Sequence, residues 1–363
     1  MNTLRASPLL RMLDLAAIGC LLTACGGGGV APATSSAPAA ATAPAAPAKP
    51  AAATAVTVVI AASNMIESAA KLAQQDGTFQ RHGIAATVTQ IAGSTTTMAA
   101  LQAGDVQFAL TTGEAVLLGQ SKHLPIVSVA ALNSGSTTSL VLSNKYLQAH
   151  PLPSNASLEQ RAALLNGAIL GTVSSTDDTN AKYLMQIAHL PATAYKSVKM
   201  QNQQAQVAAI KQGEIDGMLL SAPESFQAVA QGSGQIVLNA RDVPKWDQFP
   251  YIVALTTKGY AKDHPDSVKA ALASVEEALA KMAAGGPDVL SFERTVYPNY
   301  SDDVLQKSLD IMHLAPYKPM TQAQWDLIGQ LELDSGQLTT PFSPEEETDW
   351  TNDFLPSPPA GKA

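Results

Sequence analysis

The stretch Ala100-Leu-Gln-Ala-Gly-Asp-Val-Gln-Phe-Ala109 decides the fold, because its pattern returns at Ala209-Ile-Lys-Gln-Gly-Glu-Ile-Asp-Gly-Met218. Each stretch is typical of the end of a helix, a turn made of glycine and an acid, and a buried strand. A short match of this kind is weak by itself. Here the two copies fall at equivalent places in two series of strands and helices, so the sequence predicts a duplicated α/β architecture.

The first series contains four short apolar strands, each followed by a polar loop, and a helix follows each of the first three loops. Strands joined through helices form parallel sheets, and such sheets bind ligands at the edge where their strands end. We therefore expect the polar loops to gather at that edge. The predicted strands are 56–61, 84–91, 106–110 and 126–132, and the loops after them are 61–64, 93–96, 111–114 and 133–138.

The second series follows a strand predicted at 139–143 and a link rich in proline, asparagine and serine at 150–157. It repeats the alternation of strand, polar loop and helix. A last strand is predicted at 251–256, and the chain after Lys258 is predicted to be helical. The strands of the second series are 168–173, 198–201, 215–220 and 236–237, and its helices are 180–188, 205–212 and 221–231.

The N-terminal residues are typical of an export signal, with positive charge at Arg5 and Arg11 and a short apolar segment after it. The tetrapeptide Leu22-Thr-Ala-Cys25 resembles the bacterial lipoprotein signal, in which the cysteine is acylated and becomes the first mature residue. Residues 1–24 are therefore predicted to be a lipoprotein signal peptide and Cys25 the lipidation site. The alternative is an ordinary secretory peptide that contains a cysteine.

A tether is predicted at residues 25–55, which are nearly all Gly, Ala, Pro, Thr and Ser. Its frequent prolines favour a semi-extended spacer that holds a folded body away from a membrane. The signal's apolar segment is shorter than the roughly 20 residues that span a bilayer. No later segment is apolar enough to span one, so we expect the protein to be anchored to the membrane by lipid.

The composition excludes several classes of function. The 363 residues carry 22 Lys and Arg against 30 Asp and Glu, a net charge of −8, and no basic run suits a nucleic-acid backbone. Both cysteines precede residue 30, which leaves no thiol for a metal site or a nucleophile in the body. The six histidines show no metal-ligand spacing, and no phosphate-binding loop or nucleophile elbow is present. We expect no cofactor, no metal and no catalysis.

A family resemblance then emerges from motifs whose order and spacing are more specific than any one of them. Over about residues 56–355 the chain resembles the periplasmic substrate-binding proteins of ABC importers, of the nitrate/sulfonate/taurine and thiamine-precursor type. The matching stretches are Leu72-Ala-Gln-Gln-Asp-Gly-Thr-Phe79 with Gly83-Ile84, Leu101-Gln-Ala-Gly-Asp-Val106, Gly171-Thr-Val173, Ile210-Lys-Gln-Gly-Glu-Ile-Asp216, Pro223-Glu224, His264-Pro265 and Met320-Thr with Trp325.

The resemblance implies the type II periplasmic binding protein fold, with two doubly wound α/β lobes joined by a two-strand hinge and followed by C-terminal helices. Lobe 1 is expected at 56–143 and 250–363, and lobe 2 at 144–249. The hinge strands are expected at 139–143 and 251–256. Such lobes close on a ligand by hinge motion.

The resemblance also implies a function, namely the capture of a small molecule and its delivery to an ABC permease in the inner membrane. The protein is then expected in the periplasm, as a monomer held by the lipid anchor at Cys25, without nucleic-acid partners. An exported enzyme or a sensor accessory that uses the same fold is the alternative.

Candidate ligand-binding residues are the small polar side chains of the strand-end loops. Such side chains also cap helices routinely, and Ser94 or Thr95 in particular is expected to be a cap. Both roles can coexist, because free N–H groups at helix starts bind anions without any arginine. The candidates are Ser63, Asn64, Ser94, Thr95, Thr112, Gly113, Asn133, Ser174, Ser175, Thr176 and Ser221.

The sequence leaves the charge of the ligand open. None of the six arginines falls in a strand-end loop, whereas Glu114 and Asp177 do lie beside such loops. A carboxylate there repels an anion, and we interpret both acids as structural groups of a first helical turn. An anion and a neutral or zwitterionic nitrogenous ligand are comparable alternatives.

Overall fold

The computed structural model describes residues 53–61, 64–312 and 317–355. The predicted signal peptide, Cys25, nearly all of the predicted tether, and Ser63 lie outside these residues. Within the described ranges, no helix has both the length and the apolar character that crossing a bilayer requires.

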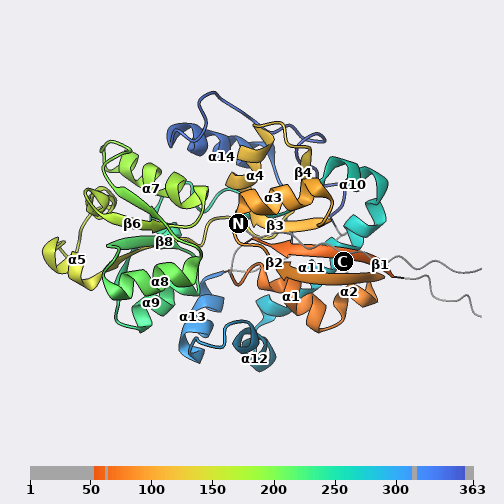
Figure 1. The fold of residues 1–363 in the computed structure, drawn as a ribbon, viewed down its shortest axis with the longest axis horizontal. Helices are drawn as coiled ribbons and strands as arrows, with labels where there is room; N and C mark the ends of the chain where they lie inside the picture. Colours follow the sequence, from red (N-terminus) through yellow and green to blue (C-terminus); the bar gives the residue numbers. More distant parts are fainter. Residues whose placement is uncertain (1–52, 62–63, 313–316, 356–363) are drawn as a thin grey trace, which may run out of the picture. The chain divides into compact units, whose positions relative to one another are not determined.

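The first sheet has the strand order β2-β1-β3-β10-β4 (Figure 1). Strand β1 pairs parallel with β2 and β3, and β10 lies antiparallel between β3 and β4. The β-branched run Val58-Val-Ile60 in β1 is fully buried, which explains why this segment forms an inner strand. The strands are β1 (Thr54–Ile60), β2 (Ile84–Gln90), β3 (Phe108–Thr112), β4 (Ile126–Ala131) and β10 (Ile252–Thr257).

The second sheet, ordered β7-β6-β8-β5-β9, repeats this plan. Strand β6 pairs parallel with β7 and β8, and β5 lies antiparallel between β8 and β9. In each sheet the antiparallel strand is the one that arrives from the other half of the chain, which confirms the duplicated architecture. The strands are β5 (Ser139–Ser143), β6 (Ile169–Thr172), β7 (Lys196–Lys199), β8 (Gly217–Leu220) and β9 (Gly234–Asn239).

Helices cover both faces of each sheet, as Figure 1 shows for α7 and α8 on either side of the second sheet. The helices are α1 (Ser68–Gln75), α2 (Thr78–Arg81), α3 (Ser94–Ala103), α4 (Gly113–Gln120), α5 (Asn144–Ala149), α6 (Leu158–Ala162), α7 (Ser175–Ile187), α8 (Gln203–Gln212), α9 (Glu224–Ala230), α10 (Lys258–Asp263), α11 (Pro265–Ala284), α12 (Pro287–Val296), α13 (Asp302–Met312) and α14 (Gln322–Asp334).

Two expectations about these elements need correction. Residues 139–143 are expected in the first lobe, but β5 pairs with β8 and β9, so the chain crosses to the second sheet before Ser139. The helical C-terminal region also ends earlier than expected, at Asp334. Gly336 has a φ of 71°, and prolines follow at 341 and 344, which together stop a helix.

The C-terminal region joins the two halves. Helix α14 contacts α4 of the first half and α7 of the second, and α13 contacts α9. One large apolar cluster runs through both sheets and includes the buried Trp246, Trp325 and Trp350. The segment around Trp350 covers the outer strand β4, because the N–H of Ser128 donates to the carbonyl of Asp349 at 3.0 Å.

Candidate ligand-binding cleft

A cavity of about 60 Å³ lies where strand ends of both sheets meet. The first half contributes the loops after β1 and β3 and the start of α3, and the second half contributes the starts of α7, α8 and α9. Thr138 and Tyr251 lie where the chain crosses between the sheets. The lining residues are Ala61, Asn64, Glu67, Gly93, Ser94, Thr111, Thr112, Thr138, Val173, Ser174, Thr176, Asp177, Gln203, Leu219, Leu220, Ser221, Glu224 and Tyr251.

Helix starts surround the cavity, because polar residues that follow the strands also cap the helices. Ser174 caps α7 in a capping box: its hydroxyl accepts from the N–H of Asp177 at 3.4 Å, and the Asp177 carboxylate accepts from the N–H of Ser174 at 3.3 Å. Thr112 caps α4 by accepting from the N–H of Ala115 at 3.4 Å. Ser174, Asp177 and Thr112 all line the cavity as well, so capping and lining coexist.

The caps of α1 and α3 differ from this pattern. Asn64 Oδ1 accepts from the N–H of Glu67 at 3.0 Å, and its amide donates to Glu67 Oε1 at 2.9 Å. Neither Ser94 nor Thr95 caps α3, contrary to our expectation. The cap position is Gly93, whose φ of 92° suits glycine, and the Ser94 hydroxyl lies 2.9 Å from Thr111 Oγ1 instead.

Hydroxyl groups connect the two halves directly across the cavity. Thr112 Oγ1 of the first half lies 2.9 Å from Thr176 Oγ1 of α7. The Tyr251 hydroxyl lies 2.7 Å from Ser221 Oγ and 3.3 Å from Thr138 Oγ1. Burial raises the pKa of Tyr251 to about 12, so this phenol stays neutral and can donate or accept.

The structure places six of the sequence candidates on the cavity wall and separates four from it. Thr95 is exposed on α3, next to Ser94, which lines the cavity. Ser175 is partly exposed on α7, next to Thr176, which lines the cavity. Gly113 and Asn133 are engaged in the scaffold. The six that line the cavity are Asn64, Ser94, Thr112, Ser174, Thr176 and Ser221.

Gly113 and Asn133 hold the first sheet to the crossing strand β10. The N–H of Gly113 donates to the carbonyl of Tyr251 at 2.8 Å, and a Cβ there would lie 2.3 Å from the carbonyl oxygen of Pro250. Asn133 Oδ1 accepts from the N–H of Ile252 at 3.0 Å, and its amide donates to the carbonyl of Gly135 at 2.8 Å. These contacts give both residues a structural role.

Several lining residues were not among the sequence candidates. Thr138 ends the predicted loop 133–138 and Tyr251 begins the strand predicted at 251–256, but neither side chain was singled out, because its place at the cavity depends on the pairing of β5 and β10. Gln203, Glu67 and Glu224 lie at or beside the first residue of a helix. A search for polar residues one turn beyond each strand-end loop would have found these three.

Buried carboxyl groups dominate the electrostatics of the cavity. Burial raises the pKa of Glu224 to about 8, although Gln204 Nε2 and the Tyr300 hydroxyl donate to its Oε1 at 3.2 and 3.4 Å. Desolvation raises the pKa of Asp177 to about 6. Among the described residues that line the cavity there is no Arg, Lys or His, and the described residues contain no group of three or more His, Cys, Asp or Glu side chains arranged to hold a metal ion.

A second pair of carboxyl groups lies behind the wall, between α4, α14 and α7. Glu332 Oε2 accepts from the Thr179 hydroxyl at 2.9 Å. Both oxygens of Glu114 are buried without a hydrogen-bond partner. Burial raises the pKa of each to about 8. Glu114 does lie in the first turn of α4, but its carboxyl caps nothing, whereas Asp177 acts as a cap.

With this geometry established, comparison with known proteins identifies the class. The fold is that of the type II periplasmic binding proteins. The chain belongs to the NMT1/THI5-like family, which it matches over residues 68–288. This confirms the resemblance drawn from the sequence. No curated protein sequence matches the chain.

Three solved structures show how widely this fold is used. The alkanesulfonate-binding protein SsuA of Xanthomonas axonopodis pv. citri, bound to MOPS, is similar with a TM-score of 0.65 and 14% identity over 80% of this chain and 96% of its own. The periplasmic nitrate-binding protein NrtA of Synechocystis has a TM-score of 0.61 and 16% identity over 78% and 81%. The desulfurization enzyme DSZB has a TM-score of 0.55 and 13% identity over 79% and 94%.

Proposed function

We propose that this protein is an extracytoplasmic solute-binding protein that captures a small molecule between two lobes and delivers it to an ABC importer. The observation that carries the proposal is the cavity, whose polar walls come from helix starts of both halves. Two of the similar proteins are named for binding, one an alkanesulfonate and the other nitrate in the periplasm. A family match across residues 68–288 supports the same role.

The two lobes of the proposal follow the two sheets. The first lobe holds β1 to β4 and β10, and the second holds β5 to β9, with boundaries near the predicted ones except that β5 moves to the second lobe. The connections before β5 and β10 are the hinge. A ligand that contacts both walls favours closure by the difference in its contacts between the open and closed forms.

The test of this function is a change of shape on binding. A thermal-shift screen of small anions, neutral polar molecules and organic cations on a chain starting at residue 53 selects ligands, and small-angle scattering then measures the radius of gyration with and without each. We expect at least one ligand both to raise the unfolding temperature and to compact the protein. A screen without any stabilising ligand, or tight binding with an unchanged radius, contradicts the proposal.

The proposed setting is the periplasm, with the protein a monomer held by a lipid on Cys25 and partnered by a permease of the inner membrane. The N-terminal sequence supports this, since a short apolar segment ends in Leu22-Thr-Ala-Cys25. The similarity to a periplasmic nitrate-binding protein supports the same compartment.

An exported enzyme remains the second candidate, because the desulfurization enzyme DSZB shares the fold. The cavity of this chain favours binding, since the described residues of its lining include no Cys or His, and the described hydrogen-bond partners of its serine hydroxyls include no basic side chain. Recovery of a chemically unchanged ligand from the purified complex, shown by mass spectrometry, is the expected result. Turnover of that ligand would favour the enzyme.

A further inference from the structure

Three carboxyl groups from three separate elements face the same small cavity. Glu67 precedes α1, Asp177 lies in the first turn of α7, and Glu224 opens α9. Glu67 and Glu224 are 0% and 1% exposed, so their charge is not screened by bulk water. Burial of carboxylates without compensation is costly, and proteins arrange hydrogen bonds or opposite charges for them.

Glu224 has an acceptor left over for a ligand. Its Oε1 receives the hydrogen bonds of Gln204 and Tyr300, and no other described side chain donates to its Oε2. The side chain is buried and lines the cavity. A buried carboxylate oxygen to which no other described side chain donates can accept a hydrogen bond from a donor carried by a ligand.

The start of α7 is already occupied by one of the chain's own acids. Asp177 accepts from the N–H groups of Val173 at 2.6 Å and Ser174 at 3.3 Å, which are the free donors before α7. Glu224 also lies in a first turn, that of α9, and its ionised form opposes an anion there. A helix start attracts an anion through its positive end, and a carboxylate in its first turn cancels that attraction.

The cavity is also small. At roughly 10–15 Å³ for each water molecule, a volume of about 60 Å³ holds only a few non-hydrogen atoms. The hydroxyl groups of Thr111, Thr112 and Ser221 on the wall can accept as well as donate, so they suit N–H donors of a ligand.

We propose that the ligand of this cleft is a small organic cation, with an ammonium or amidinium group received by Glu67, Asp177 and Glu224, and that the cleft does not hold an oxyanion. This inference rests on the proposed function, because it names the ligand class of the same cleft. The shared fold therefore serves a ligand of opposite charge to the alkanesulfonate and the nitrate for which two similar proteins are named.

Three planar molecules of equal heavy-atom count provide the test, namely guanidinium, urea and nitrate, which carry positive, zero and negative charge. Isothermal titration calorimetry of millimolar guanidinium chloride, urea and sodium nitrate is run at constant ionic strength, with methylammonium and methanesulfonate as a second pair. We expect the cations to bind most tightly and the anions not to bind. Tighter binding of nitrate or methanesulfonate overturns the ligand class but leaves the solute-binding function intact, and so does binding by divalent metal ions alone.

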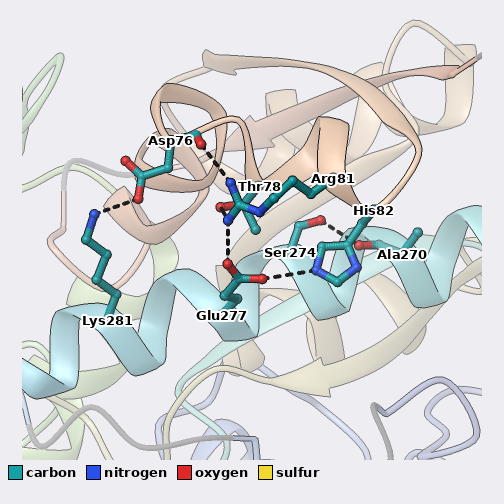
Figure 2. A network of polar contacts seen from close by, with 8 residues as sticks. All are labelled: Asp76, Thr78, Arg81, His82, Ala270, Ser274, Glu277 and Lys281. Atoms are coloured by element: carbon teal, nitrogen blue, oxygen red, sulfur yellow. Dashed lines mark hydrogen bonds and ion pairs between the residues drawn. The ribbon is translucent and has the colours of Figure 1, made fainter.

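The variant Glu224→Gln removes the negative charge of this side chain and keeps its shape. We expect it to weaken guanidinium binding by roughly tenfold or more, as loss of a charged hydrogen bond does. The matched control is Glu277→Gln, a carboxylate on the outer surface of α11 (Figure 2) that should not change the affinity. Circular dichroism shows whether each variant is folded, and Asp177→Asn provides a second variant if Glu224→Gln is not. Unchanged guanidinium affinity in a folded Glu224→Gln protein overturns the proposal.

The pH dependence gives an independent readout. Burial raises the pKa of Glu224 to about 8, so a cation must bind its ionised form and the affinity for the cation should rise as the pH increases from 6 to 9. The nearby phenols of Tyr297 and Tyr300 have raised pKa values from burial and stay neutral in this range. A guanidinium affinity that falls with rising pH would contradict the inference.

Discussion

Burial of the Glu114 carboxyl group should lower the free energy of unfolding when the group is ionised. Its carboxyl group is 1% exposed and has no hydrogen-bond partner, and Glu332 and Asp177 lie close enough to raise its pKa further. Burial is the larger cause. The pKa of about 8 in the folded chain, against roughly 4.3 in an unfolded one, means that folding favours the protonated form.

The first prediction follows from that pKa. Stability linked to Glu114 is fully present below pH 4 and is lost as the pH rises to about 8, by about 1.4 kcal/mol for each pH unit between the two pKa values. Glu114→Gln should therefore gain stability relative to the natural chain as the pH rises from 5 to 8.5, measured by urea unfolding. Glu214→Gln, in an exposed turn, is the control and should show no such trend. A constant difference across this range would contradict the raised pKa.

Thr176 tests the contact across the cleft. Its hydroxyl meets Thr112 of the other half at 2.9 Å, so Thr176→Val should weaken binding of a ligand that requires closure by about 0.5–1.5 kcal/mol. Ser175→Ala, one residue away and outside the cavity lining, should leave the affinity unchanged. Calorimetry measures the ligand affinity of both variants. An equal loss of affinity in the two would show that α7 affects binding only through the stability of the helix.

The sequence predicted the loops that form the site better than it predicted the individual side chains. Strand ends place a loop at the sheet edge, which is why Asn64, Ser94 and Ser174 were found. Which residue of a helical turn faces inward depends on the rotation of the helix, and this separates Thr176 from Ser175. The contributions of Tyr251 and Thr138 depend on contacts between distant segments, which no local pattern records.

At the scale of elements, a surface network fastens α1 and α2 to the long helix α11 (Figure 2). Glu277 of α11 accepts from the Arg81 guanidinium and lies 3.2 Å from His82 Nε2. Lys281 donates to Asp76 at 2.7 Å. Elements separated by about 200 residues in the chain are thereby held together. Hydrogen bonding from Arg81 is the main cause that lowers the pKa of Glu277.

We expect the loss of this network to change the free energy of unfolding only slightly. The lowered pKa means that the contribution of Glu277 is present above about pH 4 and is lost as the pH falls further. Because both side chains are about half exposed, Glu277→Gln should cost no more than about 1 kcal/mol at pH 7. The loss should shrink in 1 M salt, measured by thermal unfolding. A salt-independent loss would indicate packing by the side chain and not charge.

Elements were predictable because each carries its own local signal. All ten predicted strands are present, and their bounds agree within about two residues for most of them. The sequence analysis predicted helix for both α14 and the irregular segment around Trp350. The glycine at 336 and the prolines at 341 and 344 mark the end of the helix, but the prediction did not use them. The sheet to which β5 belongs was missed because pairing is a property of two distant segments.

At the scale of the whole molecule, the lipid anchor gives the remaining prediction. Cys25→Ser should move the protein from the membrane fraction to the soluble fraction of cells, because Cys25 is the proposed acylation site. Cys20→Ser, which lies within the predicted signal, is the control and should stay with the membranes. Immunoblots of the two fractions decide, and a Cys25→Ser protein that still sediments with membranes has another anchor.

The place of β10 between β3 and β4 has a consequence for folding during translation. A ribosome releases residues in order, so β4 ends at 131 and its neighbour β10 begins only at 252. Synthesis proceeds at about 5–20 residues per second, so the facing edges of β3 and β4 remain unpaired for roughly 6–24 s before β10 is made. The second sheet, encoded without interruption from 139 to 239, can form during that delay. Newly made protein should therefore be most prone to edge-to-edge aggregation while the second half is being translated.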